Sequence, residues 1–89
     1  MVTEIRADGG LDSEAAESRF LQIVGEVLGV DPVPPDRHFL EIGGDSLSMA
    51  IVIDWVAQEF AVEPELDWFF EIDTIGDVAR RWSEKRAAS

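Results

Sequence analysis

Apolar residues recur every three or four positions in the first part of the chain, which is the spacing of an amphipathic helix. The segment from about Asp12 to Gly29 has Asp12 or Ser13 as a candidate N-cap and Gly29 as a stop signal. Its apolar positions are Ala16, Phe20, Ile23, Val24, Val27 and Leu28. The pattern predicts a first helix with one buried face.

The segment that follows Gly29 is rich in proline and cannot continue this helix. Pro32, Pro34 and Pro35 each lack a backbone N–H and push the preceding residue toward an extended conformation. We therefore expect a long loop that runs to Gly44. The residues expected to pin it to the core are Val33, Phe39, Leu40 and Ile42. A long ordered loop in so small a domain is commonly functional.

Leu47 to Phe60 is predicted to be the second helix, with Ser46 or Asp45 at its N-cap. The side expected to be buried carries Met49, Val52, Ile53, Val56 and Phe60, with Ala57 beside them. The opposite side carries Asp54 and Gln58 but also Leu47 and Ile51, with Trp55 at its margin. Apolar residues on a solvent-facing side predict a docking surface.

The last third of the chain predicts one short helix and one longer helix. A turn and a short helix are expected between residues 62 and 70, with Pro64 or the acidic residues near the start of the helix. Thr74 and Asp77 form a capping-box-like start for the last helix, which ends near the cations Lys85 and Arg86. Because no strand-like alternation occurs, the predicted fold is all-α, with three main helices, one short helix and a long first loop.

Charge and composition narrow the kinds of partner. The 89 residues include 19 acidic and 7 basic side chains, for a net charge of −12. Such a charge opposes binding to nucleic acid or to anionic membranes and favours basic protein surfaces. The chain has no cysteine, so disulfides and thiolate metal sites are excluded and any thiol chemistry needs an added group.

The ends of the chain predict its organisation. No apolar stretch could span a bilayer and the N-terminus lacks a signal-like pattern, so a location in the cytoplasm is expected. The chain is also expected to be a monomer. Residues 1–11 are expected to be a flexible N-terminal tail, residues 12–86 one domain and residues 87–89 a C-terminal tail. The initial Met1 and the polar end predict a free-standing protein.

The candidate chemistry lies where the long loop meets the second helix, in the run Gly43-Gly44-Asp45-Ser46-Leu47. The glycines keep side chains away from the backbone, and the helix start offers unpaired N–H groups and the positive end of its dipole. This pattern presents the Ser46 hydroxyl for modification and would favour an anionic group on it.

The run resembles the attachment site of acyl and peptidyl carrier proteins, and the helical layout is similar to that family from about residue 13 to residue 86. The resemblance implies a four-helix carrier-protein bundle whose Ser46 carries 4′-phosphopantetheine, derived from coenzyme A, with Asp45 and Gly44 beside it. Such an arm holds an acyl or aminoacyl group as a thioester. The resemblance assigns no catalytic residue and no metal site to the chain.

The same resemblance implies a set of partners. A phosphopantetheinyl transferase would modify Ser46, an adenylation enzyme or an acyltransferase would load the arm, and condensing or tailoring enzymes would use the cargo. Contacts are expected at Leu47, Ile51, Asp54 and Trp55. The second helix is less acidic than in fatty-acid carriers, which favours specialised polyketide or nonribosomal peptide assembly, including antibiotic biosynthesis.

Several alternatives remain at this stage. Asp45 either helps to hold Mg²⁺ or only complements the helix dipole, and Gly43 and Gly44 either allow a close approach or form an ordinary turn. His38, the one histidine, is a candidate for proton transfer, although a polar loop residue is the favoured interpretation.

Two other functions compete with the carrier. A serine hydrolase would need a base and an oxyanion site, and no histidine follows Ser46. An acidic helical interaction module without a prosthetic group would explain the charge, but it leaves the serine motif without a purpose.

Overall fold

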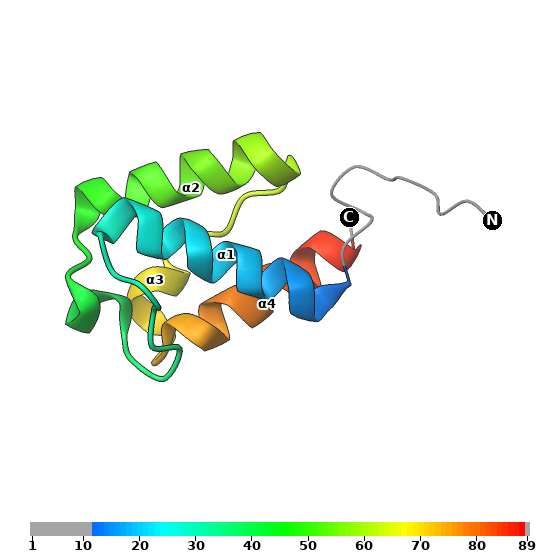
Figure 1. Ribbon diagram of the computed structural model, residues 1–89. Helices are drawn as coiled ribbons and strands as arrows, with labels where there is room; N and C mark the ends of the chain where they lie inside the picture. Colours follow the sequence, from blue (N-terminus) through cyan, green and yellow to red (C-terminus); the bar gives the residue numbers. More distant parts are fainter. Residues whose placement is uncertain (1–11, 89) are drawn as a thin grey trace.

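The computed structural model describes residues 12–88, and the predicted tail at 1–11 lies outside the described residues, as does Ser89. Within the described part, the chain forms helices only (Figure 1). In order these are α1 (Ser13–Leu28), the 3₁₀ helix η2 (Phe39–Ile42), α2 (Ser46–Phe60), α3 (Trp68–Glu71) and α4 (Ile75–Ala88). The predicted all-α bundle of three main helices and one short helix is confirmed.

The predicted ends of α1 and the start of α4 agree with the observed hydrogen bonds. Asp12 caps α1, because its carboxylate accepts the Ala15 N–H at 2.8 Å, and Gly29 closes the helix in the left-handed conformation at φ 73°. At the start of α4 the Thr74 hydroxyl accepts the Asp77 N–H at 3.1 Å.

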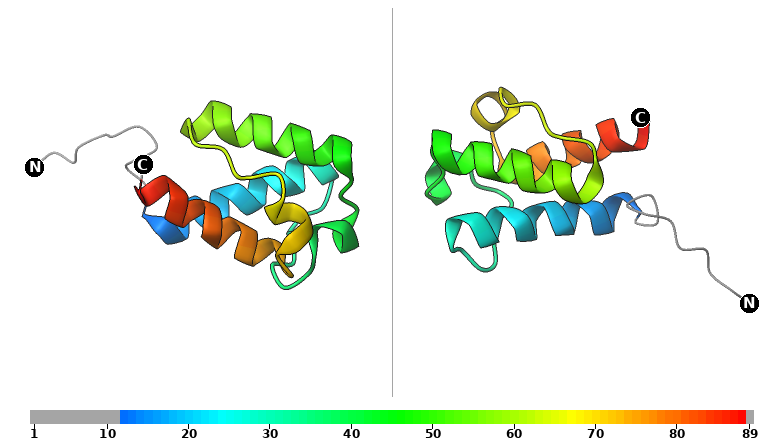
Figure 2. Two further views of the ribbon diagram at one scale, coloured as in Figure 1. Left: turned by 180° about the vertical axis from the view of Figure 1, so that it is seen from behind. Right: turned by 90° about the horizontal axis from the view of Figure 1, so that it is seen from above.

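Helix α1 lies between α2 and α4 and packs on both (Figures 1 and 2). The starts of α2 and α4 and the end of α1 share one end of the bundle, and η2 lies there too (Figure 2). The loop that the sequence predicts to be functional, which runs to Gly44, therefore lies at this end of the bundle.

Aromatic side chains form the centre of the core. The ring of Phe20 lies 5.1 Å from Trp82 and 6.4 Å from Phe69, measured between centroids, and Phe69 meets Phe39 edge-on at 5.1 Å. The Trp82 indole N–H donates to Val62 O at 2.8 Å, which satisfies the buried polar end of the ring. The core therefore reaches from α4 to η2, beside the serine loop.

Two predictions about this framework are wrong, and the structure decides between the alternatives of a third. Leu40 does not pin the loop to the core but is 48% exposed, because successive residues of a 3₁₀ turn point in different directions and Phe39 occupies the buried one. The short helix begins at Trp68, directly after the acidic Asp67, which agrees with the second of its two predicted starts and not with Pro64. Residues 87 and 88 belong to α4 and not to a C-terminal tail, consistent with the high helix propensity of alanine.

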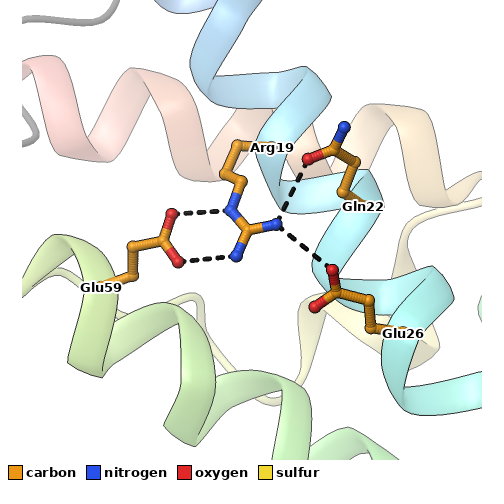
Figure 3. A network of polar contacts seen from close by, with 4 residues as sticks. All are labelled: Arg19, Gln22, Glu26 and Glu59. Atoms are coloured by element: carbon orange, nitrogen blue, oxygen red, sulfur yellow. Dashed lines mark hydrogen bonds and ion pairs between the residues drawn. The ribbon is translucent and has the colours of Figure 1, made fainter.

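Arg19 joins α1 to α2 through a bidentate ion pair (Figure 3). Its Nε and Nη2 donate to the two carboxylate oxygens of Glu59 at 2.7 and 2.8 Å, while Nη1 reaches Gln22 Oε1 at 3.2 Å and Glu26 Oε2 at 3.6 Å. The hydrogen bonds from Arg19 stabilise the Glu59 carboxylate and lower its pKa, against a smaller opposing effect of desolvation.

We expect Glu59→Gln to lower the free energy of unfolding at pH 7 by about 0.5–1 kcal/mol, since both partners are partly solvated. A carboxylate whose pKa is lower in the folded state stabilises the fold at pH values above its pKa in the unfolded state. This contribution is lost as the pH falls through the pKa of the folded state. The difference between variant and wild type should therefore shrink below about pH 4. Urea unfolding of both proteins at several pH values measures this difference in the free energy of unfolding. Glu26→Gln is the matched control, because its contact is longer, and an equal loss in both variants would contradict the prediction.

Candidate functional site

Two glycines shape the turn between η2 and α2 for different reasons. Gly43 adopts φ 99°, a left-handed conformation that other residues enter only with strain, and closes η2. Gly44 donates its N–H to Phe39 O at 3.0 Å and lies against the Phe39 ring, so that a β-carbon at this position would overlap the ring. The turn is therefore built on core packing as well as on backbone conformation.

Asp45 is the N-cap of α2, which decides between the two predicted candidates. Its Oδ1 accepts the Ser48 N–H at 2.8 Å and the Ser48 hydroxyl at 2.9 Å, while Ser48 Oγ accepts the Asp45 N–H at 2.8 Å. The backbone hydrogen bond from Ser48, followed by the hydroxyl, lowers the pKa of Asp45. Oδ1 of Asp45 is therefore the acceptor that caps the start of α2.

Ser46 is the first residue of α2 and not its cap. Its side chain is exposed, and its hydroxyl makes no hydrogen bond to any other residue in the range 12–88. It stands at the positive end of a 15-residue helix, where the first amide groups lack intrahelical acceptors. By contrast, Ser48 is half-buried and its hydroxyl belongs to the capping box.

This geometry suits a covalently attached anionic group on Ser46. The hydroxyl is accessible, the helix start stabilises negative charge, and the glycine turn places no side chain at the two positions before Asp45. A phosphodiester is the kind of group that such a site accommodates.

The predicted contact residues of α2 differ in their exposure. Leu47 is 70% exposed and Trp55 is 42% exposed, whereas Ile51 is half-buried. Asp54 is exposed and accepts a hydrogen bond from Gln58 at 2.8 Å. Leu47 is therefore the most accessible large apolar residue beside Ser46.

Two further apolar residues at this end were not predicted as contact residues. Leu40 of η2 and Phe70 of α3 are 48% and 47% exposed. The sequence pattern predicted that Leu40 would pin the loop to the core. The 3₁₀ conformation of η2 separates Leu40 from the buried Phe39, and only this feature would have indicated that Leu40 is exposed.

His38 has a structural role in this loop. Its Nδ1 accepts the Leu40 N–H at 3.0 Å and its Nε2 lies 3.0 Å from Phe70 O, while its own backbone N–H donates to Glu41 Oε1 at 2.9 Å. Both ring nitrogens therefore have partners, which agrees with the favoured interpretation of a loop residue and leaves the ring unsuited to act as a base.

The arrangement does not suit a serine hydrolase. The only imidazole of the chain is held by η2 and α3, and no histidine follows Ser46. Between residues 12 and 88 the structure contains no group of three or more acidic or histidine side chains that could hold a metal ion. Across the same range, the helices are too short or too polar to cross a membrane.

Comparison with known proteins agrees with the geometry. A family model described as "Phosphopantetheine attachment site" matches residues 18–82. Tyrocidine synthase 3 of Brevibacillus parabrevis is 36% identical over 75 residues, which cover 84% of this chain and 1% of the synthase. Phosphinothricin tripeptide synthetase PhsC of Streptomyces viridochromogenes is 36% identical over 74 residues, 83% of this chain and 7% of the synthetase.

A further relative is tyrocidine synthase 2 of Brevibacillus parabrevis, which is 38% identical over 64 residues, 72% of this chain and 2% of that synthase. The chain thus spans between 1% and 7% of the length of these three relatives. No solved structure matches the chain significantly.

Proposed function

The chain belongs to the phosphopantetheine attachment site family, whose members carry 4′-phosphopantetheine covalently, and on this premise we propose that Ser46 is the attachment point. The observation that carries the proposal is the exposed Ser46 hydroxyl, free of hydrogen bonds within residues 12–88, at the start of α2. The proposed carrier domain is residues 12–88, which include the whole of α4 and enclose the family match.

The transfer of phosphopantetheine to Ser46 needs few groups from this chain. The Ser46 oxygen forms a bond to the phosphorus next to pantetheine in coenzyme A, the phosphoanhydride bond breaks, and 3′,5′-adenosine bisphosphate leaves. The hydroxyl proton passes to a base of the transferase, which also supplies Mg²⁺. The protein is a substrate in this step and not an enzyme. Its contribution is an accessible oxygen and a helix N-terminus that stabilises the phosphodiester.

When attached, phosphopantetheine supplies a terminal thiol that carries acyl or aminoacyl groups as thioesters and keeps their local concentration high. Nonribosomal peptide assembly is favoured over polyketide assembly, because one of the relatives is named as a tripeptide synthetase and none is named for polyketides. An adenylation enzyme is accordingly the proposed loading partner, and a condensing enzyme the partner that consumes the cargo. The protein acts as a monomer in the cytoplasm.

The proposed docking face starts at Leu47 and continues along α2 to Ile51, Asp54 and Trp55. Leu47 is 70% exposed next to Ser46, so a partner that covers it would remove apolar surface from water. The excess of acidic residues favours partners with basic rims. Under limiting transferase, Leu47→Ala should be modified more slowly than the wild type, and an unchanged rate would contradict docking at this residue.

Intact-protein mass spectrometry tests the carrier proposal. We expect the folded protein, incubated with coenzyme A, Mg²⁺ and a broad-specificity phosphopantetheinyl transferase, to gain the mass of one phosphopantetheinyl group. Helicity by circular dichroism confirms that the sample is folded. A folded protein that gains no mass would overturn the proposal and favour an acidic interaction module without a prosthetic group.

A further inference from the structure

His38 connects two elements on either side of the serine loop. Its Nδ1 caps η2 by accepting the Leu40 N–H, so this nitrogen must carry a lone pair. The proton of the neutral ring then lies on Nε2, which donates to Phe70 O at 3.0 Å. One imidazole thus serves as the cap of η2 and as a tether between η2 and α3.

Helix α3 has few other attachments of this kind. It contains four residues, and its N-cap Asp67 makes no side-chain capping hydrogen bond. A helix this short has little stability of its own and depends on tertiary contacts. Phe69 lies in the core, and Trp68 packs against the core with Arg81 and Lys85 of α4 at 5.3 and 5.8 Å from its ring centroid. Phe70, by contrast, is 47% exposed, and its carbonyl is held by His38.

The chain before His38 is fixed to the start of α4. The N–H groups of Ile75 and Gly76 donate to Arg37 O at 2.7 Å and to Pro35 O at 2.8 Å. This segment is therefore a rigid base for the imidazole. The His38 tether extends that support to α3 beside the edge-on contact of Phe39 with Phe69, so it helps to fix the exposed Phe70 relative to η2.

We propose that His38 is a positioning residue, which holds α3 against η2 so that a transferase approaching Ser46 meets Leu40, Leu47 and Phe70 in a fixed arrangement. The inference rests on the proposed attachment at Ser46. When a surface is already ordered before binding, less conformational entropy is lost as the transferase docks. Loss of the tether should therefore weaken docking and leave the rate of the chemical step unchanged.

Three substitutions separate the cap from the tether. His38→Asn can still accept the Leu40 N–H, because its Oδ1 replaces Nδ1, but it is too short to reach Phe70 O. His38→Gln has an amide N–H near the position of Nε2 and no acceptor near Nδ1, and His38→Ala loses both contacts. We expect the KM of phosphopantetheinyl transfer to rise about fivefold for the Asn and Ala variants, as for one lost neutral hydrogen bond. The KM for Gln should stay within about twofold of the wild type, with kcat unchanged throughout.

Amide chemical shifts of residues 68–71 provide a readout that needs no transferase. They should move in the Asn and Ala variants and stay near the wild-type values in the Gln variant, in samples shown by circular dichroism to be folded. An Asn variant with wild-type KM and wild-type shifts would overturn the inference, as would a Gln variant that matches Ala in both. A wild-type protein that gains no phosphopantetheinyl group would instead overturn the proposed function, and the shifts would still decide whether the tether exists.

Discussion

Ser46→Ala should abolish attachment of phosphopantetheine while leaving the helical bundle intact. The hydroxyl is the oxygen that forms the phosphodiester, so no partial activity is expected to remain. The fold should survive because the side chain is exposed and makes no hydrogen bond within residues 12–88, and because the helix is capped by Asp45. Intact-protein mass spectrometry after incubation with coenzyme A and a transferase measures the loss.

Ser48→Ala is the matched control, because it removes a hydroxyl two residues away on the same helix. Its Oγ bonds to Asp45 in the capping box, so the variant should be less stable but should still gain one group. Helicity and thermal unfolding of both variants distinguish misfolding from loss of the acceptor. A Ser46→Ala protein that still gains a phosphopantetheinyl group, or a folded Ser48→Ala protein that gains none, would contradict Ser46 as the attachment point.

Much of the framework could be predicted from the sequence, because it depends on local signals. The cap at Asp12, the left-handed Gly29 and the start at Thr74 are short-range features of residue type. The buried face of α2 follows from helical periodicity, and Met49, Val52, Val56 and Phe60 are buried as expected. Ile53, also expected on this face, is half-buried against the core. The motif at Ser46 depends on neighbouring residues along the chain, so it too could be identified without a structure.

The features that could not be predicted depend on contacts between distant segments. The imidazole of His38 meets the carbonyl of Phe70, 32 residues further along the chain, and no local pattern encodes that hydrogen bond. The turn η2 is only four residues long, too short for a periodic signal, and it reverses the expected burial of Leu40. Asp45 and not Ser46 supplies the capping oxygen, so the serine hydroxyl is not used by the helix.

Gly44→Ala is expected to lower the free energy of unfolding by about 1–3 kcal/mol, the usual cost of adding a methyl group to a packed site. The added β-carbon would overlap the ring of Phe39, which is 1% exposed and packs edge-on against Phe69 at 5.1 Å. The ring can move only by disturbing the core. Urea unfolding followed by tryptophan fluorescence measures the change.

A double-mutant cycle with Phe39→Leu decides whether this contact is the cause. The smaller side chain vacates the space beside residue 44, so Gly44→Ala should cost less in the Phe39→Leu background than in the wild type. Gly43→Ala is the control, because its cost comes from φ 99° with no atom within 4 Å of the added β-carbon, and it should be equal in both backgrounds. If Gly44→Ala instead keeps full stability but slows modification of Ser46, the glycine serves the approach of the transferase and not the packing of the loop.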